Sequence, residues 1–359
     1  MNTRHIAKRK LVLGLLLFVT ATTACSADSN APSDAASPLY ESIVPKACRV
    51  GTLLGAYLVN EHSIVVLCVS GTTEKPVRRL YSINEDSHEA TMLLDGSSAG
   101  FNPIKVVGNV MYMTISDADG TPQLSALRLD AGVVAPSTVL EMADAMTSFG
   151  VSGTHAYWTW SSNSSPPTYA LSRVLLAGGP KEDILFSPFA EANDIAIVGD
   201  DVYVLGHLFV NDYSVTVERI SLPSHQPQLI FGEPKGDESN KPWFGVYRDH
   251  VLWTDTSAVP AKVYEIHGST VQRNTVIKCA PHSDAVLSGD VMAFEDRSEC
   301  VALTSQHRLG LEVAVDLSTE QANYYTNREQ SGVVFGARDG WIYMRDDKSV
   351  FRVRPDQSL

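Results

Sequence analysis

The sequence lacks the short motifs that identify many metal-dependent proteins. No His-Glu-x-x-His pair occurs, the 10 histidines are scattered, and no two cysteines stand at Cys-x-x-Cys spacing. We therefore expect no metal ion and no bound cofactor, and no motif identifies a catalytic residue. These absences favour a binding role over catalysis, while a site assembled in space from distant residues stays an alternative.

No class of residues is unusually abundant or rare in the composition. Hydrophobic residues make up 44% of the 359 residues, aromatic residues 8% and charged residues 19%, with 18 Pro and 24 Gly. Such values exclude a disordered chain, a collagen and a polytopic membrane protein. The chain is long enough to bury a large core, as one big or two ordinary domains.

The first 24 residues have the layout of a secretory signal peptide. Four basic residues (Arg4, Lys8, Arg9 and Lys10) precede an apolar run over residues 11–19, and small residues follow it. The apolar run is too short to span a membrane as a helix of the mature protein.

The end of this segment, Thr22-Thr23-Ala24-Cys25, resembles a bacterial lipobox. The resemblance implies cleavage before Cys25 and lipidation of its sulfur, which anchors the protein in a membrane. Ser26 after the cysteine implies an outer-membrane lipoprotein on the periplasmic or cell-surface side. Thr22 stands where the family has Leu or Val, and ordinary secretion with cleavage near Ala24 is the alternative.

The segment after Cys25 is small, polar and rich in Ser and Ala, so residues 25–39 are expected to form a lipidated flexible tether before a domain at residues 40–359. Removing residues 1–24 lowers Lys plus Arg from 28 to 24 against 41 Asp plus Glu, a net charge near −17. This charge disfavours nucleic acid as a partner. We expect a monomer whose partner is an envelope protein, peptide or glycan.

Four cysteines remain after Cys25, namely Cys48, Cys68, Cys279 and Cys300. An even number in an exported chain indicates two disulfides, for which three pairings are possible. We favour Cys48–Cys68 and Cys279–Cys300, because each closes a short loop.

A pattern of apolar strand, tight polar turn and apolar strand recurs seven times over residues 57–347. The turns contain Gly, Asn and Asp, which tolerate the positive φ that a tight hairpin requires. The first apolar residues after the turns are Ile64, Val110, Ala156, Val202, Val251, Val291 and Trp341, at intervals of 46, 46, 46, 49, 40 and 50 residues. This regularity indicates an internal structural repeat.

Two further strand-like stretches lie between successive markers, for example residues 214–222 and 227–232 in the fourth copy. Four short strands in a repeat of about this length are typical of a β-propeller. The seven copies therefore predict an all-β fold of seven four-stranded blades. In the sixth copy residues 300–305 and 311–317 both resemble strands, so six-bladed and eight-bladed rings stay alternatives.

The last copy has room for only three strands, at residues 332–337, 341–345 and 349–353. Residues 44–49 lie where the fourth strand of a preceding blade is expected. We predict that this N-terminal strand completes the last blade, and that a Cys48–Cys68 disulfide fastens it to the first.

Across residues 40–356 the chain resembles bacterial lipoproteins that carry a propeller of the YVTN or TolB-like kind. The resemblance lies in the repeat length and layout, and it implies an architecture rather than an activity.

Propeller ligands usually bind at the mouth of the central channel, where the chain enters the innermost strand of each blade. The candidate residues near these entries are Asn102, Phe149, Asn193, Asp194, Lys241, Trp243, Phe244, His282 and Asp284. An aromatic floor with a few carboxylates suits a sugar, a peptide or a cationic ligand. In the alternative interpretation, Phe149 and Phe244 pack between blades and the polar residues cap turns.

Two functions are compatible with these patterns. The first is a membrane-anchored, non-enzymatic propeller that binds a protein, peptide or glycan at the cell envelope. The second is a propeller enzyme, such as a glycan lyase or hydrolase, in which Asp194, His282 and Asp284 are the first candidates for acid–base chemistry.

Overall fold

The computed structural model divides the chain into two units, Met1–Ala35 and Ala36–Leu359. All described residues belong to the second unit. They are residues 40–44, 48, 51–72, 75–97, 101–116, 121–130, 135–141, 146–161, 169–187, 189–208, 213–234, 243–255, 262–273, 285–296, 311–319, 321–325 and 332–354.

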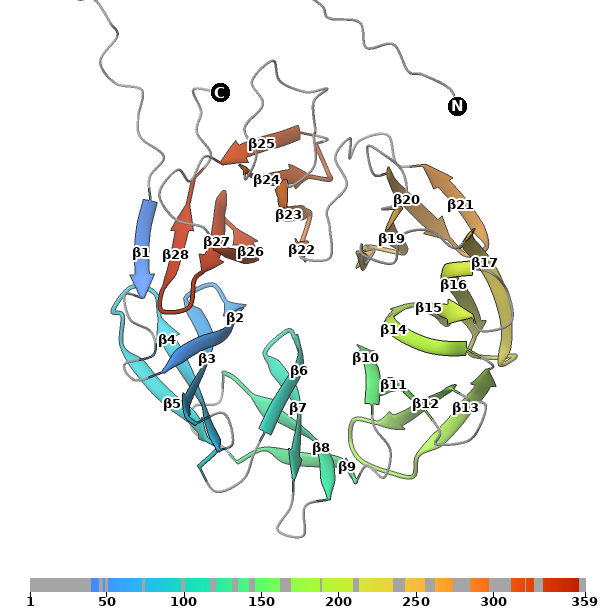
Figure 1. The fold of residues 1–359 in the computed structure, drawn as a ribbon, viewed down its shortest axis with the longest axis horizontal. Coiled ribbons are helices and arrows are strands. Elements are labelled where there is room, and N and C mark those ends of the chain that lie inside the picture. Colours follow the sequence, from blue (N-terminus) through green and yellow to red (C-terminus); the bar gives the residue numbers. More distant parts are fainter. Residues whose placement is uncertain are drawn as a thin grey trace, which may run out of the picture. The chain divides into compact units, whose positions relative to one another are not determined.

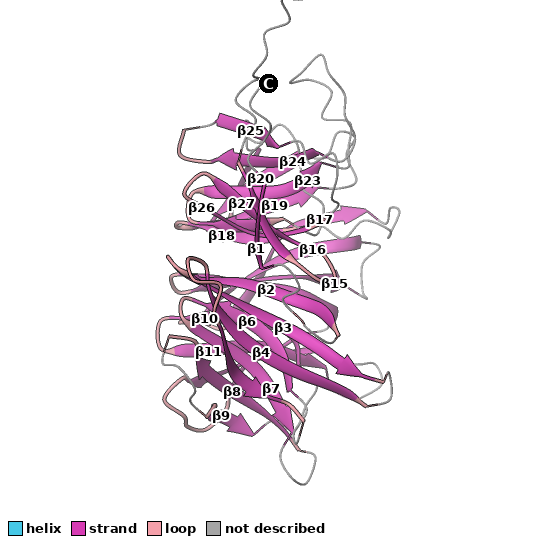
Figure 2. Ribbon diagram, turned by 90° about the vertical axis from the view of Figure 1, so that its left-hand side faces the viewer, coloured by secondary structure: helices cyan, strands magenta, loops and turns pink. Residues whose placement is uncertain are grey.

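Seven four-stranded antiparallel sheets form this unit, and they are arranged around a common centre as the blades of a propeller (Figure 1). Every regular element among the described residues is a strand (Figure 2). Within that part of the chain there is accordingly no helix long and apolar enough to cross a membrane.

Blades 1 to 4 follow one another along the chain, each beginning with its innermost strand. Blade 1 contains β2 (Thr52–Asn60), β3 (Ser63–Gly71), β4 (Pro76–Asn84) and β5 (Ala90–Asp95). Blade 2 contains β6 (Phe101–Val107), β7 (Val110–Ser116), β8 (Pro122–Arg128) and β9 (Ser137–Glu141). Blade 3 contains β10 (Met146–Ser152), β11 (His155–Ser161), β12 (Tyr169–Leu175) and β13 (Glu182–Ser187). Blade 4 contains β14 (Phe189–Val198), β15 (Asp201–Leu208), β16 (Tyr213–Ser221) and β17 (Gln226–Pro234).

Blades 5 to 7 complete the ring. Blade 5 contains β18 (Phe244–Tyr247), β19 (His250–Asp255), β20 (Lys262–His267) and β21 (Thr270–Arg273). Blade 6 contains β22 (Val286–Ser288), β23 (Val291–Asp296), β24 (Leu311–Asp316) and β25 (Gln321–Tyr325). Blade 7 contains β26 (Val333–Arg338), β27 (Trp341–Arg345) and β28 (Val350–Val353), with β1 (Tyr40–Val44) as its outer strand.

The prediction of seven blades is confirmed, and the six- and eight-bladed alternatives are wrong. In blade 6 the third strand is β24, which pairs with β23, while residues 300–305 lie outside the described part of the chain. The tight turns use positive φ as expected, for example 56° at Gly108 and 58° at Gly199.

Apolar contacts between neighbouring blades form the core. Trp158 on β11 packs in one cluster with Tyr112 and Leu124 of blade 2, whereas the adjacent Tyr157 packs in another with Val204 of blade 4. Successive side chains of a strand point to opposite faces, so each blade supplies apolar surface to both of its neighbours. No blade can bury its two faces alone.

The ring closes through the N-terminal strand, as predicted. β1 pairs antiparallel with β28, with Tyr40 opposite Val353, and Ile43 is only 1% exposed. The predicted bounds of this strand, residues 44–49, are wrong because β1 ends at Val44. Pro45 follows, and proline has no backbone N–H to donate to a strand ladder.

A disulfide joins Cys48, just after β1, to Cys68 on β3 of blade 1. This pairing is the one favoured from the sequence, and it links the closing strand covalently to the first blade. The predicted partner pair, Cys279 and Cys300, lies outside the described residues.

Buried charges reinforce the same seam. The carboxylate of Glu85, directly after β4 of blade 1, accepts hydrogen bonds from Arg338 and, at 3.0 Å, from the Tyr343 hydroxyl of blade 7. Arg352 on β28 donates to Glu85 at 3.3 Å and to Glu41 on β1 at 2.7 Å. The Glu85 side chain is only 5% exposed, so this network ties strands β1, β26, β27 and β28 of blade 7 to blade 1 inside the protein.

One buried acid has no such partners among the described residues. Glu218 on β16 is 8% exposed, and its Oε2 atom accepts no hydrogen bond there. Burial disfavours the charged form and raises the pKa of Glu218 from 4.5 to about 7.

Loss of the disulfide is expected to weaken the ring. A Cys48→Ala/Cys68→Ala variant releases a constraint between cysteines 20 residues apart, and should lower the free energy of unfolding by about 3 kcal/mol. Urea denaturation of the variant and of the oxidised wild type measures the difference. An unchanged unfolding midpoint would contradict the role of this disulfide in closing the ring.

Glu218 should make stability depend on pH. The unfolded chain releases this proton near pH 4.5 and the folded chain only near pH 7, so between these values the folded state binds more protons. The free energy of unfolding should then fall as pH rises through this window, by up to about 3 kcal/mol. Glu218→Gln should remove the fall.

Urea midpoints measured from pH 4 to 8 test this expectation. Glu61→Gln, which changes an exposed acid on the β2–β3 turn, is the matched control and should keep the wild-type profile. A Glu218→Gln variant that loses stability with pH as the wild type does would refute it.

Candidate functional site

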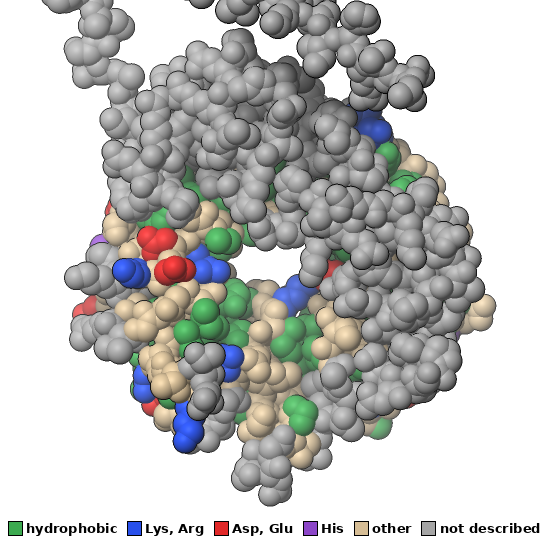
Figure 3. Space-filling view, in the orientation of Figure 1, with side chains coloured by type: hydrophobic (Ala, Val, Ile, Leu, Met, Phe, Trp, Pro, Cys, Tyr) green, Lys and Arg blue, Asp and Glu red, His purple; other side chains and the backbone are tan. Residues whose placement is uncertain are grey.

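The innermost strand of each blade lines the centre of the propeller. These strands are β2, β6, β10, β14, β18, β22 and β26, and most successive pairs are in contact. Figure 3 shows an opening at this centre, with both basic and acidic side chains on its visible wall. A ligand reaching the opening therefore meets charges of both signs.

Asp194 on β14 is the acid with the most unusual environment on these strands. Its side chain is half-buried, and its carboxylate accepts the backbone N–H of Ile195 at 2.8 Å. Burial raises the pKa of Asp194, while the charge of Lys105 and the Ile195 hydrogen bond partly oppose the shift. Lys105 is exposed on β6, so two blades contribute opposite charges that act on each other.

The three predicted aromatic ligand-binding residues lie in the core. Phe149 packs against Tyr112 at the interface of blades 2 and 3, with ring centroids 5.3 Å apart. Phe244 lies between blades 4 and 5, and the indole of Trp243 donates to the backbone oxygen of Ala285 at 2.8 Å. Each is at most 7% exposed, so these rings serve inter-blade packing.

The other predicted residues divide into two groups. Asn102 is exposed on β6, and Asn193 precedes Asp194 on β14. Lys241, His282 and Asp284 lie outside the described residues. A ligand role for the nine candidates stays a prediction, and among the described ones it is best supported for Asn102 and Asp194.

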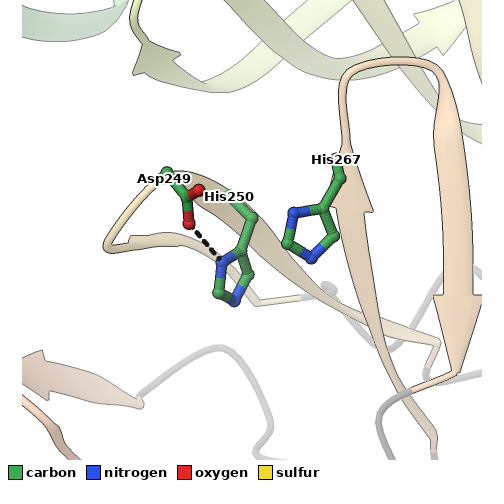
Figure 4. A group of neighbouring side chains, drawn as sticks. All are labelled: Asp249, His250 and His267. Carbon is green, nitrogen blue, oxygen red and sulfur yellow. Dashed lines mark hydrogen bonds and ion pairs between the residues drawn. The ribbon is translucent and has the colours of Figure 1, made fainter.

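A second group of chemically active side chains lies in blade 5 (Figure 4). Asp249 comes from the β18–β19 turn, His250 is the first residue of β19, and His267 is the last residue of β20. One ligand atom from each lies within 4.8 Å of the other two. Asp249 Oδ1 is 3.3 Å from His250 Nδ1, and the two imidazole rings lie 4.4 Å apart between centroids.

Neighbouring groups orient these three side chains. The hydrogen bond with His250 lowers the pKa of Asp249, which keeps its carboxylate ionised. His267 Nε2 lies 3.4 Å from Oε2 of Glu265, and that oxygen also accepts the Gln272 amide at 3.1 Å. A histidine whose second nitrogen faces a carboxylate is the usual arrangement at metal sites.

The turns that carry this group are held by adjacent blades. The Tyr247 hydroxyl and the Arg248 guanidinium both donate to Asp290 Oδ1 of blade 6, at 3.0 and 3.1 Å. From blade 4, the Tyr203 hydroxyl donates to the backbone oxygen of Gly268 at 3.2 Å. The three side chains are thus presented by anchored turns.

This group in blade 5 was not predicted from the sequence. His62, His155 and His250 lie at or next to the first turn in three repeats, and our expectation that no metal binds rested on the spacing of cysteines and the scatter of histidines. The useful signal is a histidine beside the turn between the first and second strands of a blade and another beside the turn between its third and fourth strands. Antiparallel strands bring these two turns to the same end of the sheet.

A serine motif between blades 1 and 2 has the spacing of a hydrolase nucleophile turn. Gly96-Ser97-Ser98-Ala99-Gly100 matches the pattern Gly-x-Ser-x-Gly. That chemistry requires a strand followed by a helix, whereas the neighbouring elements in the chain are the strands β5 and β6, and residues 98–100 lie outside the described residues. Its context therefore gives no support to a catalytic serine.

No protein-family model matches the chain, and no significant match is found among curated proteins. Solved structures do match. An acylaminoacyl peptidase from Pyrococcus horikoshii is 10% identical with a TM-score of 0.58, over 87% of this chain and 53% of that one. The chain thus spans about half the length of that peptidase.

Two other structures match over nearly their full length. The β-propeller domain of the trilobed protease from Pyrococcus furiosus, described as having an open velcro topology, is 10% identical with a TM-score of 0.52, over 85% of this chain and 95% of that one. An oligogalacturonate lyase in complex with manganese is 9% identical with a TM-score of 0.51, over 86% and 98%.

These matches and the seven sheets define the class: the protein carries a seven-bladed β-propeller whose last blade is completed by an N-terminal strand. The predicted resemblance to propeller-bearing proteins is confirmed at that level. At such low identity the likeness concerns the fold alone, because propellers host many unrelated functions.

Proposed function

We propose that this chain is an exported lipoprotein, anchored through Cys25, whose propeller binds a protein, peptide or glycan of the cell envelope at its central opening. The observation that carries the binding role is the presence of Asp194 and Lys105, whose opposite charges act on each other, on innermost strands of two different blades. A rigid ring that holds opposite charges in a concave opening is pre-organised for a ligand with polar groups of both kinds.

The Cys48–Cys68 disulfide supports the proposed export. Disulfides persist in oxidising compartments such as the periplasm and the cell surface, and they are rare in the reducing cytosol. The signal-peptide pattern of residues 1–24 points to the same compartment. The outer membrane follows from Ser26 in the lipobox resemblance and belongs to the proposal.

The charge of the chain supports a partner other than nucleic acid. A net charge near −17 after removal of residues 1–24 repels a polyphosphate backbone. Closure of the ring by β1 also gives each blade two neighbours within one chain, which is consistent with a monomer.

A propeller enzyme is the second candidate, and Asp194 is the observation that favours it. A carboxyl group whose pKa is raised by burial is suited to acid–base chemistry. The enzymes among the similar structures share only the fold with this chain, so the binding role is preferred.

The anchor is tested by Cys25→Ser in the native host. We expect the wild type in the membrane fraction and the variant in the soluble exported fraction, because acyl chains supply the affinity for the membrane. Mass spectrometry of the N-terminal peptide detects the lipid directly. A wild-type protein with an unmodified Cys25 thiol would contradict the anchoring.

The opening is tested with arrays of envelope glycans and peptides probed by the purified full chain. Lys105→Ala and Asp194→Asn should each weaken binding of the captured ligand about tenfold or more, because each removes a hydrogen bond to a charged group. Lys348→Ala, at an exposed turn of blade 7, is the matched control and should bind as the wild type does.

If all three variants bind the ligand with the affinity of the wild type, the ligand does not bind at the central opening. Turnover of an array member that Asp194→Asn abolishes would replace the binding role with catalysis.

A further inference from the structure

We propose that Asp249, His250 and His267 form a binding site for a divalent transition-metal ion, with Zn²⁺ as its representative. The site lies on the turns at one end of blade 5, and its role is separate from that of the central opening. Two imidazoles and one carboxylate are ligands that zinc takes in proteins.

The distances fit such an ion. Ligand atoms about 2.0–2.1 Å from a tetrahedral zinc lie about 3.3 Å from one another. Asp249 Oδ1 and His250 Nδ1 are already 3.3 Å apart, which is long for a hydrogen bond between a carboxylate and an imidazole. The third ligand atom is within 4.8 Å, and the exposed His267 side chain faces the other two across a short gap (Figure 4).

The buried position of His250 is a further observation. This residue is 8% exposed, and within the described part of the chain its Nε2 atom has no hydrogen-bond partner. The ion would bind the other ring nitrogen, Nδ1, which faces Asp249. Because the ring is buried, its packing fixes the direction in which Nδ1 points.

A neighbouring carboxylate orients the imidazole ring of His267. Its Nε2 atom faces Glu265, itself held by Gln272, which leaves Nδ1 available for the ion. Three protein ligands leave a fourth position for water or for a group of a bound partner. The exposed side of the site, formed by Asp249 and His267, is where that fourth ligand would enter.

Blade 1 provides a natural comparison. His62 on the β2–β3 turn faces Asp86 on the β4–β5 turn at 3.5 Å, and both are well exposed. The pair offers one imidazole and one carboxylate where blade 5 offers two imidazoles and one carboxylate. His62→Ala is therefore a matched control for the loss of a turn histidine.

The test is a competition titration of Zn²⁺ against a chromogenic chelator, using the full chain purified in detergent without a histidine tag. We expect one ion per chain for the wild type. His267→Ala and Asp249→Asn, both at exposed positions, should weaken binding at least tenfold, and Glu265→Gln, which removes the orienting charge, about tenfold. His62→Ala should leave the affinity unchanged.

Substitution with Co²⁺ supplies a second readout, because the visible absorption of bound cobalt reports its coordination geometry. The wild type and His62→Ala should give a four-coordinate spectrum that His267→Ala lacks. Thermal unfolding without metal checks that the variants fold as the wild type does. A wild type that does not bind Zn²⁺, or a His267→Ala variant that binds it equally well, would overturn the site.

Discussion

The closed ring is the constraint on which the rest of this structure depends. Each blade buries its two apolar faces only against its neighbours, so the last blade must meet the first. β1 supplies the outer strand of blade 7, the Cys48–Cys68 disulfide ties its end to blade 1, and Glu85 gathers two arginines at the seam. Hydrogen bonds, a covalent bond and buried charges thus act at one place.

A closed ring also fixes the places where chemistry can occur. The innermost strands hold Asp194 and Lys105 around the centre, and the tight turns hold His250 and His267 at the edge of blade 5. In both groups the side chains are attached to backbone segments that contacts with neighbouring blades hold in place. A ligand at the centre meets several blades, whereas an ion at the turns meets one.

Much of the fold was predictable because each repeat carries its own local signals. Apolar residues after a tight polar turn marked the second strand of every blade, and Val110, Val291 and Trp341 are the first residues of β7, β23 and β27. The closing strand lies at Tyr40–Val44 and not at residues 44–49, and Pro45, which has no backbone N–H for a strand ladder, follows it. Phe149 and Phe244 were candidates for a ligand floor, but an apolar side chain on an inner strand serves packing equally well, and the sequence does not distinguish the two uses.

The sequence by itself determined the seven-fold repeat, the closure of the ring by an N-terminal strand and the favoured disulfide, since each depends on short-range patterns or on the spacing of a few residues. Only the tertiary structure decided that Lys105 acts on Asp194 and that His267 faces His250. Those relations depend on the order of blades around the axis and on the register of hairpins. The local conformational preferences of the chain determine neither the order of the blades nor the register of the hairpins.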